Sequence, residues 1–183
     1  MRKIIATEWM SLDGISDASS MAEWFNPYHS DSRGALIAEN IHDCTTMLYG
    51  RKTYEMLFPY WSSLKNNEMG VADKLNQTEK YVVSGTMQEA GWENSTIIDQ
   101  DIINTIKTLK SSGEGNILIQ GSATLVKSLL KEGLIDELKL MIQPHIMGSG
   151  KRLFTEGISA GLERKAIKQL DNGVIEITYA PIG

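Results

Sequence analysis

Cysteine, histidine and proline are scarce in this sequence: its 183 residues include one cysteine, three histidines and four prolines. The single Cys44 excludes an intrachain disulfide framework and fits a reducing compartment. His29, His42 and His145 lie far apart along the chain, so we expect no metal site. The chain has 18 Lys and Arg against 23 Asp and Glu, a formal net charge of −5. This balance argues against a protein-wide attraction to nucleic acid.

Long hydrophobic runs are also missing. The apolar stretch that begins at Ile4 meets a carboxylate at Glu8, which makes it too short for a signal peptide, and no later stretch is long enough to span a membrane. We therefore expect a cytoplasmic protein. The hydrophobic fraction of 42% is ordinary for a globular chain, and neither a repeat nor a Pro/Gly/Ser-rich linker divides it. Residues 1–183 are expected to form one domain.

Apolar segments of two kinds alternate along the first two thirds of the chain. Short β-branched or aromatic runs predict strands, and apolar residues at helical spacing predict helices between them. Pro59 is expected to stop the second helix, Asp99 and Asp101 are candidate caps of the third, and Gly133 suits the end of the fourth. This alternation predicts an α/β domain with a mostly parallel sheet. The predicted strands are 4–10, 46–49, 80–84 and 116–119, and the predicted helices are 32–43, 50–57, 102–109 and 125–130.

The last third of the chain changes character. Leu138, Leu140 and Ile142 alternate with polar residues, as in a half-exposed strand. Residues 166–170 and 174–179 flank Asp171-Asn172-Gly173, a strong hairpin signal. We therefore expect the sheet to end in an antiparallel hairpin.

Three predicted strand ends carry residues suited to binding a phosphorylated ligand. Ligands of open α/β sheets bind beyond the carboxyl ends of the strands, where helix N-termini present free N–H groups. Each segment taken alone is more simply explained as an ordinary turn, a polar loop or tight helix packing. Their occurrence at three successive strand ends favours a dinucleotide. The segments are Gly50, Arg51, Lys52 and Thr53; Ser84, Gly85 and Thr86; and Gln120, Gly121, Ser122, Ala123, Thr124 and Leu125.

Five short motifs occur in an order that resembles the RibD C-terminal domain family. They are residues 11–14 (SLDG), 48–55 (LYGRKTYE), 120–122 (QGS), 133–138 (GLIDEL) and 144–154 (PHIMGSGKRLF). The resemblance covers almost the whole chain. It implies a three-layer dihydrofolate-reductase-like fold and a stand-alone relative of the reductase half of the bifunctional riboflavin-biosynthesis enzyme.

The same resemblance implies NADPH as the cofactor. Residues 50–53 would receive its phosphates, with Arg51 and Lys52 favouring NADPH over NADH. Ser84 and its neighbours would take the adenosine side, and residues 120–125 the pyrophosphate. Dihydrofolate reductases have a cis peptide bond at this last position, so a cis bond between Gln120 and Gly121 is expected, although without proline it costs about 3–4 kcal/mol.

The substrate side departs from the dihydrofolate reductases, which carry a buried carboxylate on their first helix. Counting back from Gly50 reaches Gly34, and the nearest acids are Asp31, Glu39 and Asp13. These three are the candidate catalytic carboxylates, although each is more often a helix cap or a surface charge. Large apolar side chains are candidates for the substrate wall, with Trp24 and Trp61 expected as lids. The wall candidates are Trp9, Met10, Trp24, Tyr54 and Trp61.

We therefore predict an NADPH-dependent reductase that transfers hydride to a small heterocyclic, pyrimidine-like or pteridine-like, or carbonyl substrate. Reduction of 5-amino-6-(5-phosphoribosylamino)uracil is the reaction that the resemblance implies. A flavin or another foreign acceptor is an open alternative. The rival hypothesis is a non-catalytic, dimeric nucleotide-binding protein that keeps the fold without turnover. Family members commonly pair, so we expect a homodimer, with the strand region 138–147 as a candidate contact or, alternatively, as a sheet edge that the chain's own hairpin covers.

Overall fold

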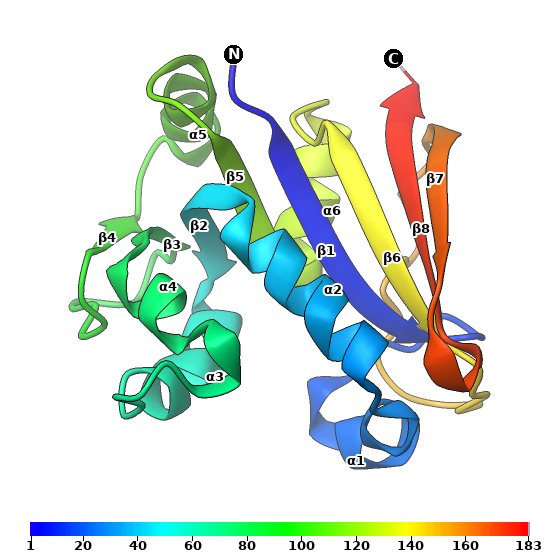
Figure 1. The fold of residues 1–183 in the computed structure, drawn as a ribbon. Coiled ribbons are helices and arrows are strands. Elements are labelled where there is room, and N and C mark those ends of the chain that lie inside the picture. The colour runs from blue at the N-terminus through cyan, green and yellow to red at the C-terminus, as the bar shows by residue number, and fades with distance from the viewer. Residues whose placement is uncertain (183) are drawn as a thin grey trace.

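A single mixed β-sheet forms the centre of the computed structural model, which describes residues 1–182 (Figure 1). The strand order is β4-β3-β2-β5-β1-β6-β8-β7. The first six strands in this order are parallel, β8 runs antiparallel to β6, and β7 pairs antiparallel with β8 as a hairpin. The strands are β1 (Ile4–Ser11), β2 (Cys44–Gly50), β3 (Glu79–Val83), β4 (Ser95–Ile98), β5 (Asn116–Gln120), β6 (Glu137–Gln143), β7 (Gly161–Gln169) and β8 (Ile175–Ile182).

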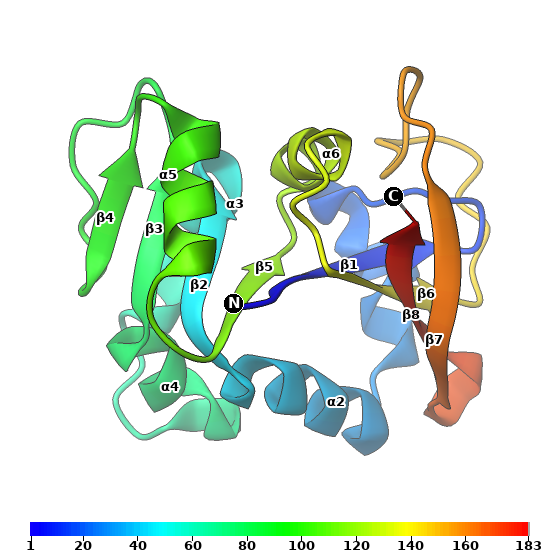
Figure 2. The same ribbon diagram turned by 90° about the horizontal axis from the view of Figure 1, so that it is seen from above.

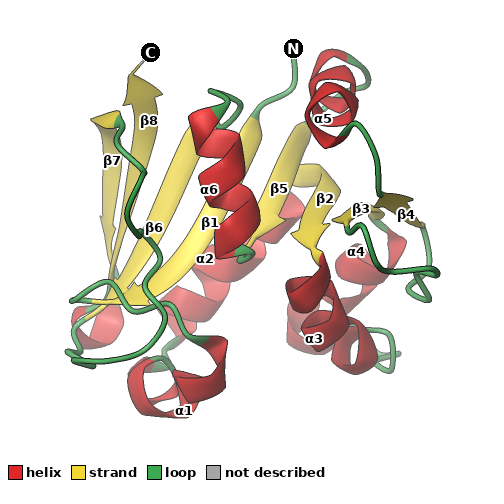
Figure 3. Ribbon diagram, turned by 180° about the vertical axis from the view of Figure 1, so that it is seen from behind, coloured by secondary structure: helices red, strands yellow, loops and turns green. Residues whose placement is uncertain are grey.

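Helices cover both faces of this sheet. Figure 2 shows α5 and α6 on one face and α2 and α4 on the other, and Figure 3 shows α6 in front of the sheet. Strand–helix–strand crossovers place parallel strands side by side, which produces this three-layer arrangement. None of the helices formed by residues 1–182 is long and apolar enough to cross a membrane. The helices are α1 (Met21–Trp24), α2 (Asp31–His42), α3 (Arg51–Trp61), α4 (Ala72–Gln77), α5 (Ile102–Ser111) and α6 (Ala123–Lys131).

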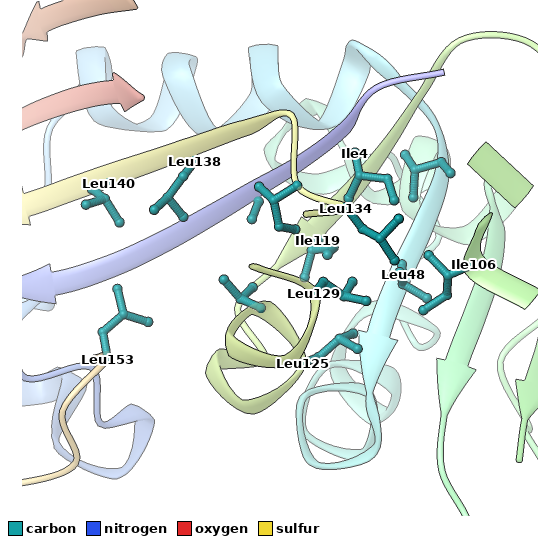
Figure 4. Close-up of a cluster of buried hydrophobic side chains, with 14 of the residues drawn as sticks. Ile4, Leu48, Ile106, Ile119, Leu125, Leu129, Leu134, Leu138, Leu140 and Leu153 are labelled. Carbon is teal, nitrogen blue, oxygen red and sulfur yellow. The ribbon is translucent and has the colours of Figure 1, made fainter. Parts of the chain in front are cut away.

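The two faces of the sheet have separate cores because alternate strand residues point to opposite sides. In β1, Ile4 and Ala6 pack against α5 and α6, and Ile5 packs against the layer that contains α2 and α4. Figure 4 shows the core between the sheet and helices α5 and α6, with Ile106 and Leu129 among its members. Each large apolar side chain buried in this way contributes roughly 1.5–3 kcal/mol.

The turns predicted from the sequence are present. Gly133 ends α6 with a φ of +64°, and the next amide, that of Leu134, donates to the Leu129 carbonyl. A left-handed residue closes a helix in this way, and glycine adopts that conformation without strain. At the tip of the β7–β8 hairpin, Asn172 and Gly173 also have positive φ, as the turn requires.

Two local predictions are wrong. Pro59 does not stop α3 but lies inside it, and the helix continues for two more residues, to Trp61. The helix tolerates proline so near its end because only one internal hydrogen bond is lost. Asp101 occupies the N-cap of α5, but its carboxylate accepts a hydrogen bond from the Asn104 side chain and caps no backbone amide. The short elements α1, α4 and β4 were not predicted. They span only four to six residues, which is too short for a periodic pattern.

The strand expected at a dimer contact is β6, and it lies inside the sheet. Its backbone pairs with β1 on one side and with β8 on the other. A second copy of the chain therefore cannot add a strand to it. The chain's own hairpin covers this edge, which was the alternative interpretation of the region.

Candidate functional site

A cavity of about 850 Å³ opens at the carboxyl ends of the central strands. It runs from the end of β1 past the N-termini of α3 and α6 and reaches the start of α5. Its walls come from seven regions of the chain. They are residues 7–9; residues 16, 18, 21 and 24; residues 50–53 with 56 and 57; residue 83; residues 102 and 103; residues 120–125 with 128, 129, 131 and 132; and residue 151.

The cavity forms where two neighbouring strands part. Strands β1 and β5 pair as far as Thr7 and Gln120, and the Gly121 amide then donates to the Thr7 carbonyl. Beyond this point β1 continues to Ser11, paired on that stretch with β6. Strand β5 instead turns into α6 through Gly121 and Ser122, both with positive φ. The separation of strands β1 and β5 leaves a gap at a position where open α/β sheets bind their ligands.

Two helix N-termini meet at this gap. The Gly50 amide donates to the Ser122 hydroxyl over 2.8 Å, which joins the junction before α3 to the junction before α6. A Cβ atom on Gly50 would lie 3.3 Å from the Ser122 Oγ, so glycine allows the close approach. In the described chain neither helix has a side-chain cap at its N-terminus. The free amides and the positive ends of both helix dipoles therefore face one space.

Cations surround the same space. Arg51 lies in the first turn of α3 and pairs with Glu55 over 3.0 Å, with both side chains partly exposed. Lys52 is exposed beside it, and the exposed Lys151 also lines the cavity. The overall charge of the chain is negative, so these side chains make a local anion-attracting region.

The predicted binding segment at residues 84–86 is placed differently. Val83, the last residue of β3, lines the cavity, but Ser84, Gly85 and Thr86 lie outside its wall. The Ser84 hydroxyl accepts hydrogen bonds from the Thr86 and Met87 amides over 3.2 and 3.0 Å. It therefore closes its own loop. The structure brings together the segments at 50–53 and 120–125 and leaves residues 84–86 at the side.

The predicted cis bond is wrong. Every peptide bond within residues 1–182, including that between Gln120 and Gly121, is trans. Left-handed backbone at Gly121 and Ser122 makes the turn instead, with φ of +68° and +71°. Two consecutive positive φ values reverse the chain without a cis bond.

Two of the five predicted wall residues line the cavity. Trp9 stacks on Phe25 with ring centroids 4.4 Å apart. Trp24 was expected in a loop, as a lid, but it lies in α1, is 1% exposed, and donates from its indole nitrogen to the Asp17 carbonyl. It is a fixed part of the wall because a core of apolar side chains surrounds it.

The other three wall candidates lie elsewhere. Tyr54 belongs to an aromatic cluster on the α2 side of the sheet, where its hydroxyl accepts a hydrogen bond from the Trp92 amide over 2.8 Å. Trp61 packs against the same cluster. Met10 packs against the core under α5 and α6. These positions make them core residues rather than cavity residues.

The three candidate carboxylates also lie away from the cavity wall. Asp31 is exposed at the first turn of α2, and Glu39 is exposed and pairs with Lys168 of β7. Asp13 accepts hydrogen bonds from the Ser11 hydroxyl and from the Met147 and Gly148 amides. These bonds, that from Ser11 foremost, lower the pKa of Asp13 to about 2, and they tie together two loops. Across residues 1–182, no three His, Cys, Asp or Glu side chains gather as metal ligands.

Sequence reasoning missed the one carboxylate that does reach the cavity from the sheet. Glu8 lies on β1, is 2% exposed, and lines the cavity. Its Oε1 atom has no hydrogen-bond partner among the described residues, and burial raises the pKa of its carboxyl to about 8. The signal was present in the strand pattern, because Glu8 follows Ile4 and Ala6 on the face of β1 that packs against the core.

Comparison with known proteins identifies the family. A model of the RibD C-terminal domain family matches residues 2–175. The chain belongs to this family. Among its relatives is protein YyaP of Bacillus subtilis, 29% identical over 147 residues that cover 76% of this chain and 75% of the relative.

Solved structures share the fold. A pyrimidine reductase-like protein from Corynebacterium diphtheriae has a TM-score of 0.72 at 14% identity, covering 100% of this chain and 92% of that one. Dihydrofolate reductase from Enterococcus faecalis, complexed with NADP(H), has a TM-score of 0.66 at 17% identity, with 99% and 97% covered. The predicted α/β architecture, with its dihydrofolate-reductase-like sheet and antiparallel C-terminal strands, is confirmed.

Proposed function

We propose that this chain is an NADPH-dependent reductase that transfers hydride to a small heterocyclic, pyrimidine-like or pteridine-like, or carbonyl substrate. One observation carries the proposal: the N-termini of α3 and α6 open into a single cavity beside the cations of α3. Membership of the RibD C-terminal domain family and the NADP(H) complex of the E. faecalis enzyme support it.

The residues present suit a phosphorylated dinucleotide. The uncapped amides of α3 and α6 suit its phosphate oxygens, and the Thr53 hydroxyl lines the same wall. Arg51 and Lys52 would hold the additional phosphate that distinguishes NADPH from NADH. Residues 120–125 would hold the pyrophosphate. When bound, the cofactor supplies the hydride.

The chain's own residues align and enclose the substrate. Trp9 and Trp24 give the end of the cavity near β1 a flat, apolar wall that suits a planar ring. Because Phe25 and the core behind α1 hold both indoles, the wall is ordered before the substrate arrives. A preformed wall excludes water and positions the electrophilic carbon.

Titration of the purified chain with NADPH, followed by nicotinamide fluorescence, tests the cofactor assignment. We expect saturable binding and a preference for NADPH over NADH that falls at least about 10-fold when Arg51 and Lys52 are both changed to alanine, since a hydrogen bond to a charged group contributes about 1.5–3 kcal/mol. Lys165→Ala, on β7, is the matched control. Absence of NADPH binding to the wild type would defeat the reductase proposal.

Turnover is then measured as NADPH oxidation across a panel of acceptors: aminopyrimidines, pteridines, carbonyl compounds and flavins. Oxidation that depends on one acceptor class identifies the substrate class. The rival, a nucleotide-binding protein without turnover, is favoured by the position of Asp13, Asp31 and Glu39 outside the cavity. Tight NADPH binding with no acceptor-dependent oxidation would support that rival.

The proposal includes a homodimer. Because β6 is paired on both sides, the contact must be formed by surfaces other than the edge of β6. Light scattering at micromolar concentration measures the mass in solution, and a monomeric mass would contradict this part of the proposal.

A further inference from the structure

We propose that Glu8 is the acid that protonates the substrate during hydride transfer. This role rests on the proposed reductase function. It makes Glu8 a catalytic residue and narrows the substrate class to compounds whose reacting C=N or C=O bond ends on a heteroatom that must take up a proton.

The position of Glu8 carries the inference. It is the first residue of β1 beyond the last pair with β5, Thr7 and Gln120, so it lies where the two strands part and the cavity begins. On its other side it pairs with Leu140 of β6 within the sheet. Pairing with β6 therefore holds the backbone at Glu8 in place, and the side chain projects from a rigid strand rather than from a loop.

The missing partner of Glu8 points to a ligand. Its side chain is 2% exposed, and Oε1 has no hydrogen-bond partner among residues 1–182. An unpaired buried polar atom costs about 1–3 kcal/mol, so buried carboxyls normally have partners. A substrate heteroatom in the cavity would supply the hydrogen bond that the protein leaves open.

The surroundings keep this carboxyl in its acid form at neutral pH. Burial raises its pKa to about 8, and the nearby charge of Lys127 on α6 lowers it by less. Other charged groups around the cavity are Arg51, Lys52, Lys131, Glu132 and Lys151, and the last four are exposed to solvent. A neutral carboxyl holds a transferable proton, and a pKa near the working pH suits a general acid.

The step balances in atoms and electrons. The substrate carbon accepts hydride, with its electron pair, from the bound cofactor, which is oxidised. The π bond of the substrate C=N or C=O breaks, and its electron pair moves to the nitrogen or oxygen, which takes the proton from the Glu8 carboxyl. The resulting carboxylate regains a proton from solvent after the product leaves.

Glu8→Gln tests this role because the amide keeps the size of the side chain and has no acidic proton. We expect kcat with an accepted substrate to fall at least about 100-fold, the usual minimum contribution of a general acid. NADPH affinity should stay within about threefold, because residues 50–53 and 120–125 are unchanged. Glu8→Leu should behave in the same way. Glu163→Gln, an exposed carboxylate on β7, is the control and should keep wild-type kcat.

The pH profile separates proton donation from a purely structural role. Wild-type kcat should fall as pH rises through about 8, tenfold per pH unit above it. The residual activity of Glu8→Gln should show no such fall. If the wild type reduces a substrate and Glu8→Gln does so at the same rate, the Glu8 proposal fails while the reductase function stands. If the wild type binds no NADPH, the reductase function itself fails.

A second measurement needs no turnover. Nuclear magnetic resonance can follow the titration of Glu8 directly in a chain labelled at the glutamate carboxyl carbons. The Glu8 signal is assigned as the one that is missing in Glu8→Gln. We expect a midpoint near 8 and a changed shift when NADP⁺ and a substrate analogue bind. Titration near 4.5, the ordinary value, would overturn the proposal whatever the activity.

Discussion

Replacing Glu8 with glutamine is expected to stabilise the folded chain at alkaline pH. In the folded state the carboxyl loses its proton only near pH 8, against an ordinary pKa of 4.5, because it is buried. The folded state therefore binds this proton over a pH range in which the unfolded state has released it. By linkage, the stability of the wild type falls as pH rises from about 4.5 to about 8 and then levels off.

The size of the effect follows from the pKa difference. At 1.36 kcal/mol per unit, a shift from 4.5 to about 8 corresponds to about 5 kcal/mol at and above pH 9, as an upper estimate. Total stabilities of natural domains are only about 5–15 kcal/mol, so this contribution is large. Glutamine carries no ionisable proton, and its amide stays neutral across the same range.

Urea unfolding of the wild type and Glu8→Gln between pH 5 and pH 9 measures the difference. We expect similar free energies of unfolding at pH 5 and a gap that widens with pH in favour of the variant. Glu163→Gln should follow the wild type at every pH, because its carboxylate is exposed. Parallel curves for Glu8→Gln and the wild type would refute the reasoning, since they would mean that Glu8 ionises as readily in the folded chain as in the unfolded one.

Three further predictions concern the scaffold. Lys80 donates to three backbone carbonyls at 2.7–3.0 Å while fully buried, so Lys80→Met should lower the free energy of unfolding by about 3 kcal/mol in urea titrations. Gly115 has a φ of +71°, and a Cβ there would clash with the Thr45 side chain, so Gly115→Ala should cost about 3 kcal/mol; an unchanged melting curve would contradict this. Asp13→Ala should speed hydrogen exchange at the Gly148 amide, which loses its acceptor, and unaltered exchange would count against the loop-tying role of Asp13.

Much of the architecture follows from local patterns along the chain. Alternating strands and helices predict the parallel sheet, and the Asp171-Asn172-Gly173 turn predicts the closing hairpin; both are present. Gly133 ends its helix as expected. The periodicity of each strand and helix and the residues of each turn are local features of the chain, which is why composition and spacing reveal them.

The candidate site is only partly visible in the sequence. The segments at 50–53 and 120–125 were predicted, and the structure places them on one cavity, since the carboxyl ends of neighbouring parallel strands meet at one edge. Loop residues are less predictable. Ser84 bonds to its own loop, and Asp13 bonds to amides more than 130 residues away, at positions that no local pattern indicates.

Patterns along the sequence predict the fold class, the order of the longer strands and helices, and the glycine turns that allow close approach at the strand ends. The tertiary structure alone decided which acid reaches the cavity. Strand alternation shows that Glu8 shares a face with Ile4 and Ala6, but it does not show that β5 turns away beside it and leaves a gap. That gap arises from pairing between strands more than 100 residues apart, and it is what makes a buried carboxyl a candidate for chemistry.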